Sequence, residues 1–513
     1  MAKGMGMFGA DKGRSVQDYI DEMPVWADGT PVGYTPMTGM QWRIWWLAAF
    51  GKFFEGMVVF TTAVALPLIS AEFGLGATEH GVIGAASLAG ILVGALLLGG
   101  LSDTFGRKFM FVVEMILFII FLVLLSVSPT YFWLAVFLFG VGVALGCDYP
   151  TAHLIISESI PSANRGRLVL AAFGFQALGA LAGTAVGYAV LVNDPTVSAW
   201  RLMYAAVILP AAIVTVARFF ITESAPWLFA QGRTLEAARE TARLLYREPA
   251  YPHQVELATP AVGAGTPGHG AGASGWRELF TRRNRRATIL ASVPWFMQDL
   301  STYGIGLFTP TILAAAFGHG TPIQHDVTDI VASQVLAAEG AALIDTLLIA
   351  GIFAAVLLAD RVGRIPLQII GFIGCAAGLL LAAMSHYYPD PGRTLLIFAG
   401  FMLFNFMTNV GPNAQTYLIA GEVFPTRVRG KGAGLAAATG KIGAVLTAFL
   451  FPILLADIGT TALLIGLALT SFAGAAITWA FRVETMGADL ERLHQRAADD
   501  SLDTIAGAAR EPA

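Results

Sequence analysis

An all-α membrane protein, with twelve transmembrane helices in two six-helix bundles related by pseudo-symmetry, is the fold that the sequence predicts. Three observations lead to it: the composition, the number of long apolar runs, and two motifs that recur at matching places in the two halves. Of the 513 residues, 56% are hydrophobic and 13% are charged, whereas a soluble domain typically carries about 25% charged residues. This excess of apolar residues indicates lipid rather than water around much of the chain.

Twelve apolar runs are long enough to cross a bilayer, because a spanning helix needs roughly 20 residues at a rise of about 1.5 Å per residue. We expect these runs at about 44–69, 80–102, 109–128, 131–156, 168–192, 202–221, 287–317, 338–359, 365–385, 394–419, 432–456 and 459–481.

A long polar segment separates the sixth run from the seventh and leaves six runs on either side. It opens with a helix-prone stretch, LEAARETARLLYRE, and continues as a Gly/Pro/Ala-rich linker. A second soluble insert, at about 318–337, joins the seventh run to the eighth. The expected divisions are an N-terminal segment, a first bundle, a central loop, a second bundle and a tail, at 1–40, 41–221, 222–286, 287–482 and 483–513.

Lys and Arg are concentrated in alternate loops, and cytoplasmic loops are the ones enriched in these residues. They follow the second, fourth, eighth and tenth runs and are frequent in the central loop, whereas the opposite loops carry Arg201 and Arg393. We therefore expect both termini in the cytoplasm and the protein in a bacterial-type inner membrane. The N-terminal segment has no apolar core before a small-residue cleavage site, so we expect no secretory signal peptide.

Several classes of function are disfavoured by composition and motifs. A net charge of −4 provides no basic field to recruit nucleic acid. The cysteines, Cys147 and Cys375, lie inside apolar runs and are interpreted as packing residues. No metal-ligand cluster, nucleophile elbow or phosphate-binding glycine loop occurs at an informative spacing. We expect a monomer without enzymatic activity, cofactor or metal, whose partners are a small solute, protons and the bilayer.

Two loop motifs occur twice. The loop after the second run reads GGLSDTFGRK and the loop after the eighth reads LLADRVGR, while Glu-x-x-Pro followed by Arg-Gly comes after both the fourth and the tenth runs. Two motifs repeated in register indicate internal duplication, and two related bundles can rock about a shared site. One copy alone could be turn residues with cytoplasmic charge; the pairs favour gating, with Arg bonding acids across the seam between the bundles. The matched residues are Asp103, Gly106, Arg107, Glu158 and Arg165 in the first half, and Asp360, Gly363, Arg364, Glu422 and Arg429 in the second.

Ionisable residues inside the apolar runs mark a pathway, because a charge near the bilayer centre costs about 2.5–3.5 kcal/mol on insertion scales. In the seventh run, Trp295, Asp299 and Tyr303 recur every four residues and share one helix face. They can form one wall of a site in which Asp299 exchanges a proton. The alternative is a structural acid bonded to a neighbouring helix.

Other buried polar residues allow two interpretations each. Lys52 and Glu55, three residues apart in the first run, either neutralise each other or take part in proton coupling. Lys441 is a positive charge for an anionic solute or the counter-ion of Asp299. In the tenth run, asparagines recur every four residues beside Pro412. We favour packing for the first of them, Asn405, and contact with solute for the last, Asn413.

The loop signatures DTFGRK and DRVGR resemble those of the major facilitator superfamily, and the resemblance covers nearly all of residues 40–485. It implies the major facilitator fold and secondary transport. Within the superfamily, GCDYPTAHLIISE, WFMQDLSTYGIGLF and GPNAQTYLIAGEVFPTRVRG are similar to segments of phosphate:proton symporters. The loop elements are also similar to those of sugar and organic-acid:proton symporters.

Carried over position by position, the phosphate-symporter pattern implies proton coupling by Glu55, Asp148 and Asp299. The sequence departs from that pattern after Glu55, where Gly-Met-Val follows, and at Cys147, which replaces a glycine. The substrate contacts that the resemblance implies are Tyr149, Gln176, Trp295, Asp299, Tyr303, Asn413 and Lys441.

These observations together predict a proton-coupled symporter of a small anion, either inorganic phosphate or an organic acid, that works by alternating access. Two alternatives stay open: a symporter of a sugar or another neutral metabolite, and a receptor that binds solute without moving it.

Overall fold

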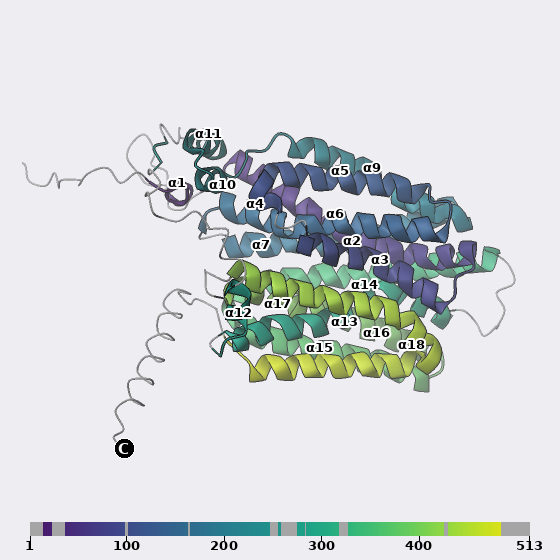
Figure 1. Ribbon diagram of the computed structural model, residues 1–513. Coiled ribbons are helices and arrows are strands. Elements are labelled where there is room, and N and C mark those ends of the chain that lie inside the picture. The colour runs from purple at the N-terminus through teal and green to yellow at the C-terminus, as the bar shows by residue number, and fades with distance from the viewer. Residues whose placement is uncertain are drawn as a thin grey trace, which may run out of the picture.

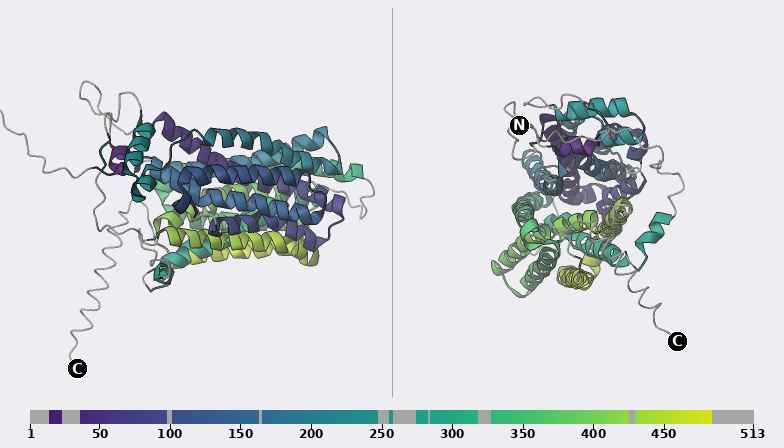
Figure 2. Two further views of the ribbon diagram at one scale, coloured as in Figure 1. Left: turned by 45° about the horizontal axis from the view of Figure 1, so that its top comes forward. Right: turned by 90° about the vertical axis from the view of Figure 1, so that its left-hand side faces the viewer.

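The computed structural model describes residues 14–22, 36–97, 101–162, 165–246, 255–257, 274–282, 284–317, 327–424 and 429–483. Within these ranges the regular structure is helical, apart from an isolated bridge between Arg14 and Leu257. Long helices run side by side through one elongated body (Figure 1). Seen from one end, the helices from the two halves of the sequence form two groups that face each other (Figure 2).

The first half consists of six membrane-crossing segments. The fifth of them is interrupted at Gly174, which divides it into two helices, α7 and α8. The segments are α2 (Gly39–Phe73), α3 (Ala77–Leu97), α5 (Arg107–Ser126), α6 (Tyr131–Ser159), α7 (Arg165–Phe173) with α8 (Phe175–Asn193), and α9 (Trp200–Arg218).

The second half repeats this arrangement. Its fourth segment breaks at Gly411 before Pro412, and its last helix contains a non-helical residue, Gly459, with φ 77° and ψ 168°. The segments are α13 (Arg285–Phe317), α14 (Val327–Val362), α15 (Arg364–Met384), α16 (Gly392–Val410) with α17 (Pro412–Glu422), and α18 (Arg429–Ala480), which Gly459 divides into two.

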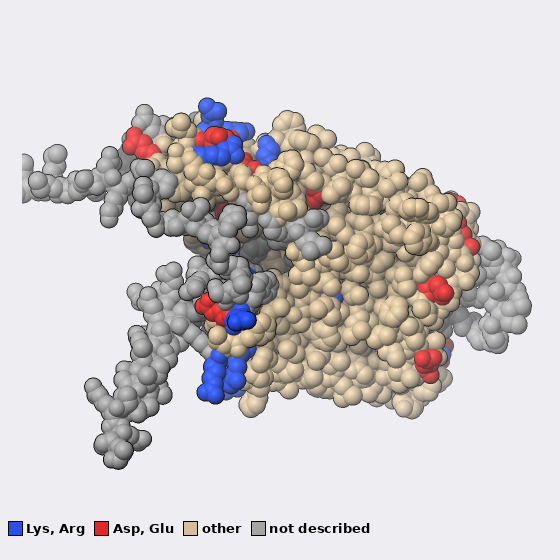
Figure 3. Space-filling view, in the orientation of Figure 1, with Lys and Arg blue, Asp and Glu red and all other residues tan. Residues whose placement is uncertain are grey.

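The number of spans agrees with the sequence prediction. Among the described residues, 10 helices are long and apolar enough to cross a membrane. One of these, α18, supplies two spans, and α13 has 33 residues and completes the twelve. On the face shown in Figure 3, charged side chains gather near the two ends and leave a broad, almost uncharged band between them. The prediction of a twelve-helix membrane fold is confirmed.

The shorter helices lie at one end of the molecule, the end that carries Arg107 and Arg364, called the motif end from here on (Figure 1). They include the helix-prone start of the central loop and part of the N-terminal segment: α1 (Val16–Asp21), α4 (Leu101–Phe105), α10 (Ala225–Ala230), α11 (Thr234–Leu245) and α12 (Ser274–Leu279). The glycine-rich linker at 258–273 and the tail from 484 onward lie outside the described residues.

The insert expected at 318–337 differs from the prediction. Residues from Val327 onward are helical and form the start of α14, so the connection is shorter than the hydropathy pattern indicates. Polar residues in this first turn of α14 interrupt the apolar run without interrupting the helix. Residues 318–326 lie outside the described part of the chain.

Glycines bring helix backbones together within each half. A Cβ atom on Gly179 of α8 would lie 1.9 Å from the carbonyl oxygen of Phe53 in α2, and one on Gly90 of α3 would lie 2.1 Å from that of Phe139 in α6. Small residues at such contacts are the usual basis of close helix packing in membranes, where apolar surface gains nothing by leaving lipid.

The two halves are pressed together at the end opposite the motif end, called the far end. A Cβ on Gly81 of α3 would lie 2.3 Å from the carbonyl oxygen of Phe449 in α18. At the motif end, Phe173 of α7 stacks on Tyr417 of α17 with ring centroids 4.6 Å apart. The surface is hollowed between the halves at this end (Figure 3). The close approach at Gly81 therefore closes the interface between the halves at the far end, whereas the hollow lies at the motif end.

We expect Gly179→Ala to lower the free energy of unfolding by about 1–3 kcal/mol, because the added methyl group overpacks the contact between α2 and α8. Gly466→Ala is the matched control, since a Cβ there meets nothing within 4 Å. Thermal unfolding of both variants in detergent checks this expectation. Equal melting temperatures for the two variants would contradict it.

Candidate substrate and proton site

Lys441 lies at the centre of a buried cluster to which both halves contribute. Its Nζ donates to the hydroxyl of Tyr303 at 2.6 Å and lies 3.6 Å from carboxylate oxygens of both Glu55 and Asp299. Glu55 belongs to α2 in the first half, whereas the other three residues belong to α13 and α18 in the second. Lys441, Glu55 and Asp299 are each at most 4% exposed. One ammonium group therefore joins two buried acids across the interface.

Glu55 has further partners in the first half. Lys52 donates to its Oε2 at 2.9 Å, and Gln176 of α8 donates to its Oε1 at 3.3 Å. Gln176 also donates to the Tyr303 hydroxyl at 3.3 Å. Lys52 and Glu55 are thus paired, as one of the two interpretations from the sequence has it, and the pair belongs to the same cluster as Lys441.

The four-residue spacing on α13 puts Asp299 and Tyr303 against Lys441. Trp295, one turn earlier, is 4% exposed, and its ring fits against Gly440, where a Cβ would lie 2.6 Å from the indole. Tyr417 meets the same indole edge to face, with ring centroids 6.2 Å apart. The missing side chain of Gly440 lets the large ring lie next to the lysine.

Asp148 belongs to a second charged group, next to the first. Arg218 of α9 donates to Asp148 at 2.9 Å and to Glu114 of α5 at 2.7 Å. The guanidinium is fully buried and lies 3.4 Å from the centroid of the Phe111 ring. A Cβ on Gly51 of α2 would lie 2.0 Å from the Asp148 carboxylate. One arginine therefore holds two acids, and Asp148 packs directly on the first helix.

Sequence reasoning missed Glu114 and Arg218. Arg218 stands at the end of the sixth run, where a cytoplasmic charge is ordinary. Glu114 lies inside the third run, and an ionisable residue at that depth was the available signal. Their partnership depends on the packing of α5, α6 and α9, which no spacing along the chain indicates.

The asparagines of the tenth run have different partners. Asn413 accepts from Gln298 at 3.2 Å and donates to Asn409 at 2.6 Å, and Gln298 is the neighbour of Asp299. Asn405 donates to a carboxyl oxygen of Asp345 at 3.2 Å. Asn413 is thus joined to the central cluster through α13, whereas Asn405 bonds α14 to α16. Asp345 is a buried acid that sequence reasoning missed.

The repeated motifs form the same ion pair in each half. Arg107 lies 3.3 Å from Glu158, and Arg364 lies 3.2 Å from Glu422. These two ion pairs join helices within a half, whereas the sequence led us to expect arginines that bond acids across the seam. The reason is that each Arg begins the helix that packs beside the one ending in the Glu.

The glycines of the first motif adopt positive φ, 105° at Gly106 and 100° at Gly363, a conformation that side chains disfavour. Arg165 donates to the carbonyl of Ile160 at 3.4 Å. The helices carrying Asp103, Tyr149, Asp360 and Arg429 are described, but these four side chains lie outside what the structure describes.

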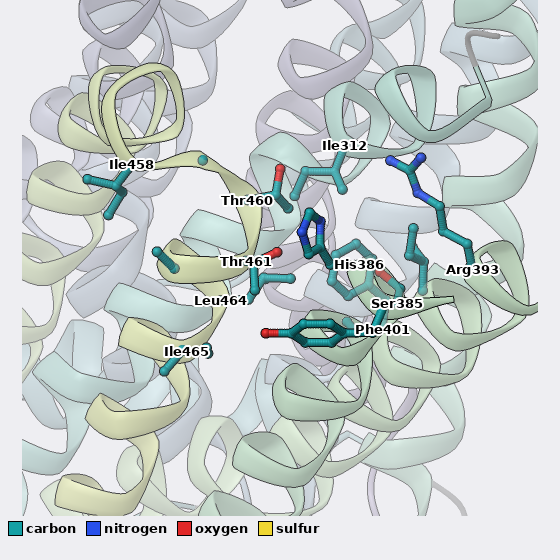
Figure 4. A pocket seen from close by; sticks show the side chains of 15 residues that line it. Ile312, Ser385, His386, Arg393, Phe401, Ile458, Thr460, Thr461, Leu464 and Ile465 are labelled. Carbon is teal, nitrogen blue, oxygen red and sulfur yellow. The ribbon is translucent and has the colours of Figure 1, made fainter. Parts of the chain in front are cut away.

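A cavity of about 490 Å³ lies elsewhere, at the far end of the second half (Figure 4). His386, Arg393 and Thr461 are among its lining residues. None of the charged residues around Lys441 lines it. The central cluster is closed in this conformation, and its residues rather than an open pocket define the candidate site.

We expect Arg218→Leu to cost about 3–5 kcal/mol of stability, because it leaves two acids buried without their cation. Arg201→Leu is the matched control: Arg201 pairs with Glu72 at 2.7 Å, with side chains 30% and 25% exposed, and partly exposed pairs contribute about 0–1 kcal/mol. Unfolding measurements on both purified variants distinguish them, and equal losses would contradict the buried role.

Comparisons with known proteins give the family. The model of the family described as sugar (and other) transporter matches residues 44–497. A putative inorganic phosphate transporter of Schizosaccharomyces pombe is 27% identical over 491 residues, which cover 83% of each chain. The niacin transporter NiaP of Acinetobacter baylyi is 26% identical over 410 residues, covering 80% of this chain and 86% of that protein.

Solved structures agree in fold. The xylose transporter XylE from E. coli, in a partially occluded inward open conformation, superposes with a TM-score of 0.70 at 20% identity. The superposition covers 88% of this chain and 100% of the XylE chain. The relatives and structural neighbours are transporters, not enzymes. The chain belongs to the sugar (and other) transporter family, and it has the fold of the major facilitator superfamily structure of XylE.

Proposed function

We propose that this transporter is a proton-coupled symporter of a small anion, with inorganic phosphate as the first candidate. The observation that carries the proposal is the position of Lys441, within 3.6 Å of both Glu55 and Asp299. A buried cation is what an anionic solute requires, and buried acids beside it are what proton coupling requires. The phosphate transporters among the relatives support the choice of anion.

Protonation of Asp299 removes one of the negative charges that hold Lys441 and leaves its ammonium group for the solute. Gln176, Tyr303 and Trp295 then supply neutral hydrogen-bond donors around the anion. Because proton binding favours anion binding, anion binding favours proton binding by the same free energy. The two ions therefore move together when the halves rock.

The charge balance supports the same conclusion. The two charged groups contain three cations, Lys52, Arg218 and Lys441, and four acids, Glu55, Glu114, Asp148 and Asp299. Fully ionised, they carry one negative charge in excess. An added anion makes this buried excess larger, which is costly in a low dielectric unless protons enter with it.

Alternating access fits a molecule whose halves meet closely at the far end. We place the motif end and both termini in the cytoplasm of a bacterial-type inner membrane, because Lys and Arg follow the spans that finish there. The divisions at 41–221 and 287–482 are then the two rocking bundles, and the functional unit is a monomer.

An organic acid is the second candidate substrate. It is favoured by the niacin transporter among the relatives. A carboxylate would use the same ammonium group of Lys441.

We expect Asp299→Asn to lower uptake driven by a pH gradient in proteoliposomes by about tenfold or more, which corresponds to roughly 1.4 kcal/mol. The amide keeps the shape of the side chain but cannot bind and release a proton as the carboxyl group does. Asp457→Asn, at an exposed position of α18, is the control and should transport as the wild type does. Wild-type uptake that ignores the gradient would rule out proton coupling.

Competition against labelled phosphate decides the substrate class. Unlabelled phosphate should compete best, and Lys441→Gln should weaken phosphate binding by about tenfold or more, since a buried charge-assisted bond contributes about 1.5–3 kcal/mol. A carboxylate that outcompetes phosphate selects the organic acid. A neutral sugar that binds Lys441→Gln as well as the wild type selects the sugar alternative.

A further inference from the structure

Asp345 is a buried acid at the seam between the two halves, outside both charged groups of the candidate site. It belongs to α14 of the second half and is 3% exposed. One carboxyl oxygen lies 2.9 Å from the hydroxyl of Thr184, on α8 of the first half. The other accepts a hydrogen bond from Asn405 of α16 at 3.2 Å. The carboxyl therefore makes a polar contact across the interface that must change when the halves rock.

No Lys, Arg or His of the described chain forms an ion pair with Asp345. The elements packed around it bring neutral groups, Thr184 from α8 and Asn405 from α16. Two other helices that pack against α14 carry buried ionisable residues, Lys52 and Glu55 on α2 and Asp299 and Tyr303 on α13, and these are bound in the cluster around Lys441. An ionised carboxyl here would be a buried charge without a counter-ion, which proteins avoid by keeping the group neutral.

The hydrogen bonds also favour a neutral carboxyl. The Thr184 hydroxyl lies within bonding distance of two acceptors, the Ala180 carbonyl at 3.1 Å and Asp345 at 2.9 Å. A hydroxyl has one proton to donate. If the Thr184 hydroxyl donates its proton to the Ala180 carbonyl, the Asp345 carboxyl group must itself be protonated and donate a hydrogen bond to the Thr184 oxygen. A protonated Asp345 satisfies the hydroxyl, the carbonyl and the Asn405 amide together.

The hydrogen bonds of Asp345 inside the second half stay in place when that half moves as a unit, whereas its bond across the interface does not. Asn405 binds Asp345 itself, and Asn409 donates to the Leu348 carbonyl at 2.8 Å, so α14 and α16 are joined at the acid and about one turn beyond it. The contact with Thr184 is the one that reaches the other half. Separation of α8 from α14 removes this contact and admits water to the carboxyl.

We infer that Asp345 is a further proton-carrying residue of the transport cycle, which holds its proton while α8 and α14 are packed together and releases it to water when they separate. The step is a simple dissociation, in which the carboxylic acid gives its proton to water and the carboxylate keeps the electron pair. No other reactant is needed. The inference rests on the proposed proton symport, since Asp345 adds a carrier to the carboxyls around Lys441.

The test uses the full-length protein and two readouts. Infrared spectra of the purified protein at neutral pH report protonated carboxyl groups through their C=O stretch. We expect Asp345→Asn to lose intensity in this band, and Glu339→Gln, an exposed acid on the same helix, to leave it unchanged. An identical band in wild type and Asp345→Asn overturns the inference, whatever the substrate proves to be.

The second readout is the number of protons moved with each labelled inorganic phosphate in proteoliposomes. Asp345→Asn is expected to lower it by about one proton, because the amide mimics the neutral acid but cannot release a proton. Asp345→Glu should restore the wild-type ratio, and Thr184→Val should keep the proton but shift the pH dependence of uptake.

The outcomes separate the two proposals. Wild-type phosphate uptake without proton movement overturns the symport and the role of Asp345 with it. Wild-type proton movement that Asp345→Asn reproduces overturns the role of Asp345 alone. Because Asp345→Asn keeps both hydrogen-bond partners, a folded variant is expected, and Asp345→Glu covers the case in which it does not fold.

Discussion

The shared position of Lys441 constrains the rest of the structure. Its ammonium group lies between Glu55 and Asp299, which come from opposite halves, so separation of the halves around the site breaks the buried Lys441–Glu55 pair and leaves Glu55 with Lys52 and Lys441 with Asp299. A solute anion or a proton can take the place of one of these partners. In the proposed symport, motion of the bundles is thereby linked to what occupies the cluster, because breaking the buried Lys441–Glu55 pair is costly when nothing replaces either partner.

Close backbones make this arrangement possible. The charged groups reach each other because residues without side chains stand where a larger residue would separate the helices: Gly51 against Asp148, and Gly440 against Trp295. Polar chemistry and helix packing are therefore set by the same small residues. At the motif end, the pairs Arg107–Glu158 and Arg364–Glu422 join helices within a half. Such pairs inside each bundle fit the proposal that the bundles move as units.

The fold was accessible from sequence because its signals are local. Apolar runs set the spans, and the repeated loops set the division into halves. The run boundary near Gly459 predicted two helices where the backbone turns sharply. The four-residue spacing on α13 also placed Asp299 and Tyr303 on one face. Arg218 and Asp345 were missed because their partners lie on other helices, and the sequence pattern carries no information about which faces meet.

The candidate site itself follows the duplication. Glu55 and Asp299 lie on the first helix of their respective halves, while Gln176 and Lys441 lie eleven and twelve residues beyond the matched arginines Arg165 and Arg429. Equivalent helices thus supply one acid each and one long polar side chain each. The symmetry is broken where Gln176 stands opposite Lys441, since only one of them is charged. Lys441 is held by two acids, so in the proposed symport a proton on one of them frees its ammonium group for the anion, and the lysine of the second half supplies a charge that the glutamine of the first half lacks.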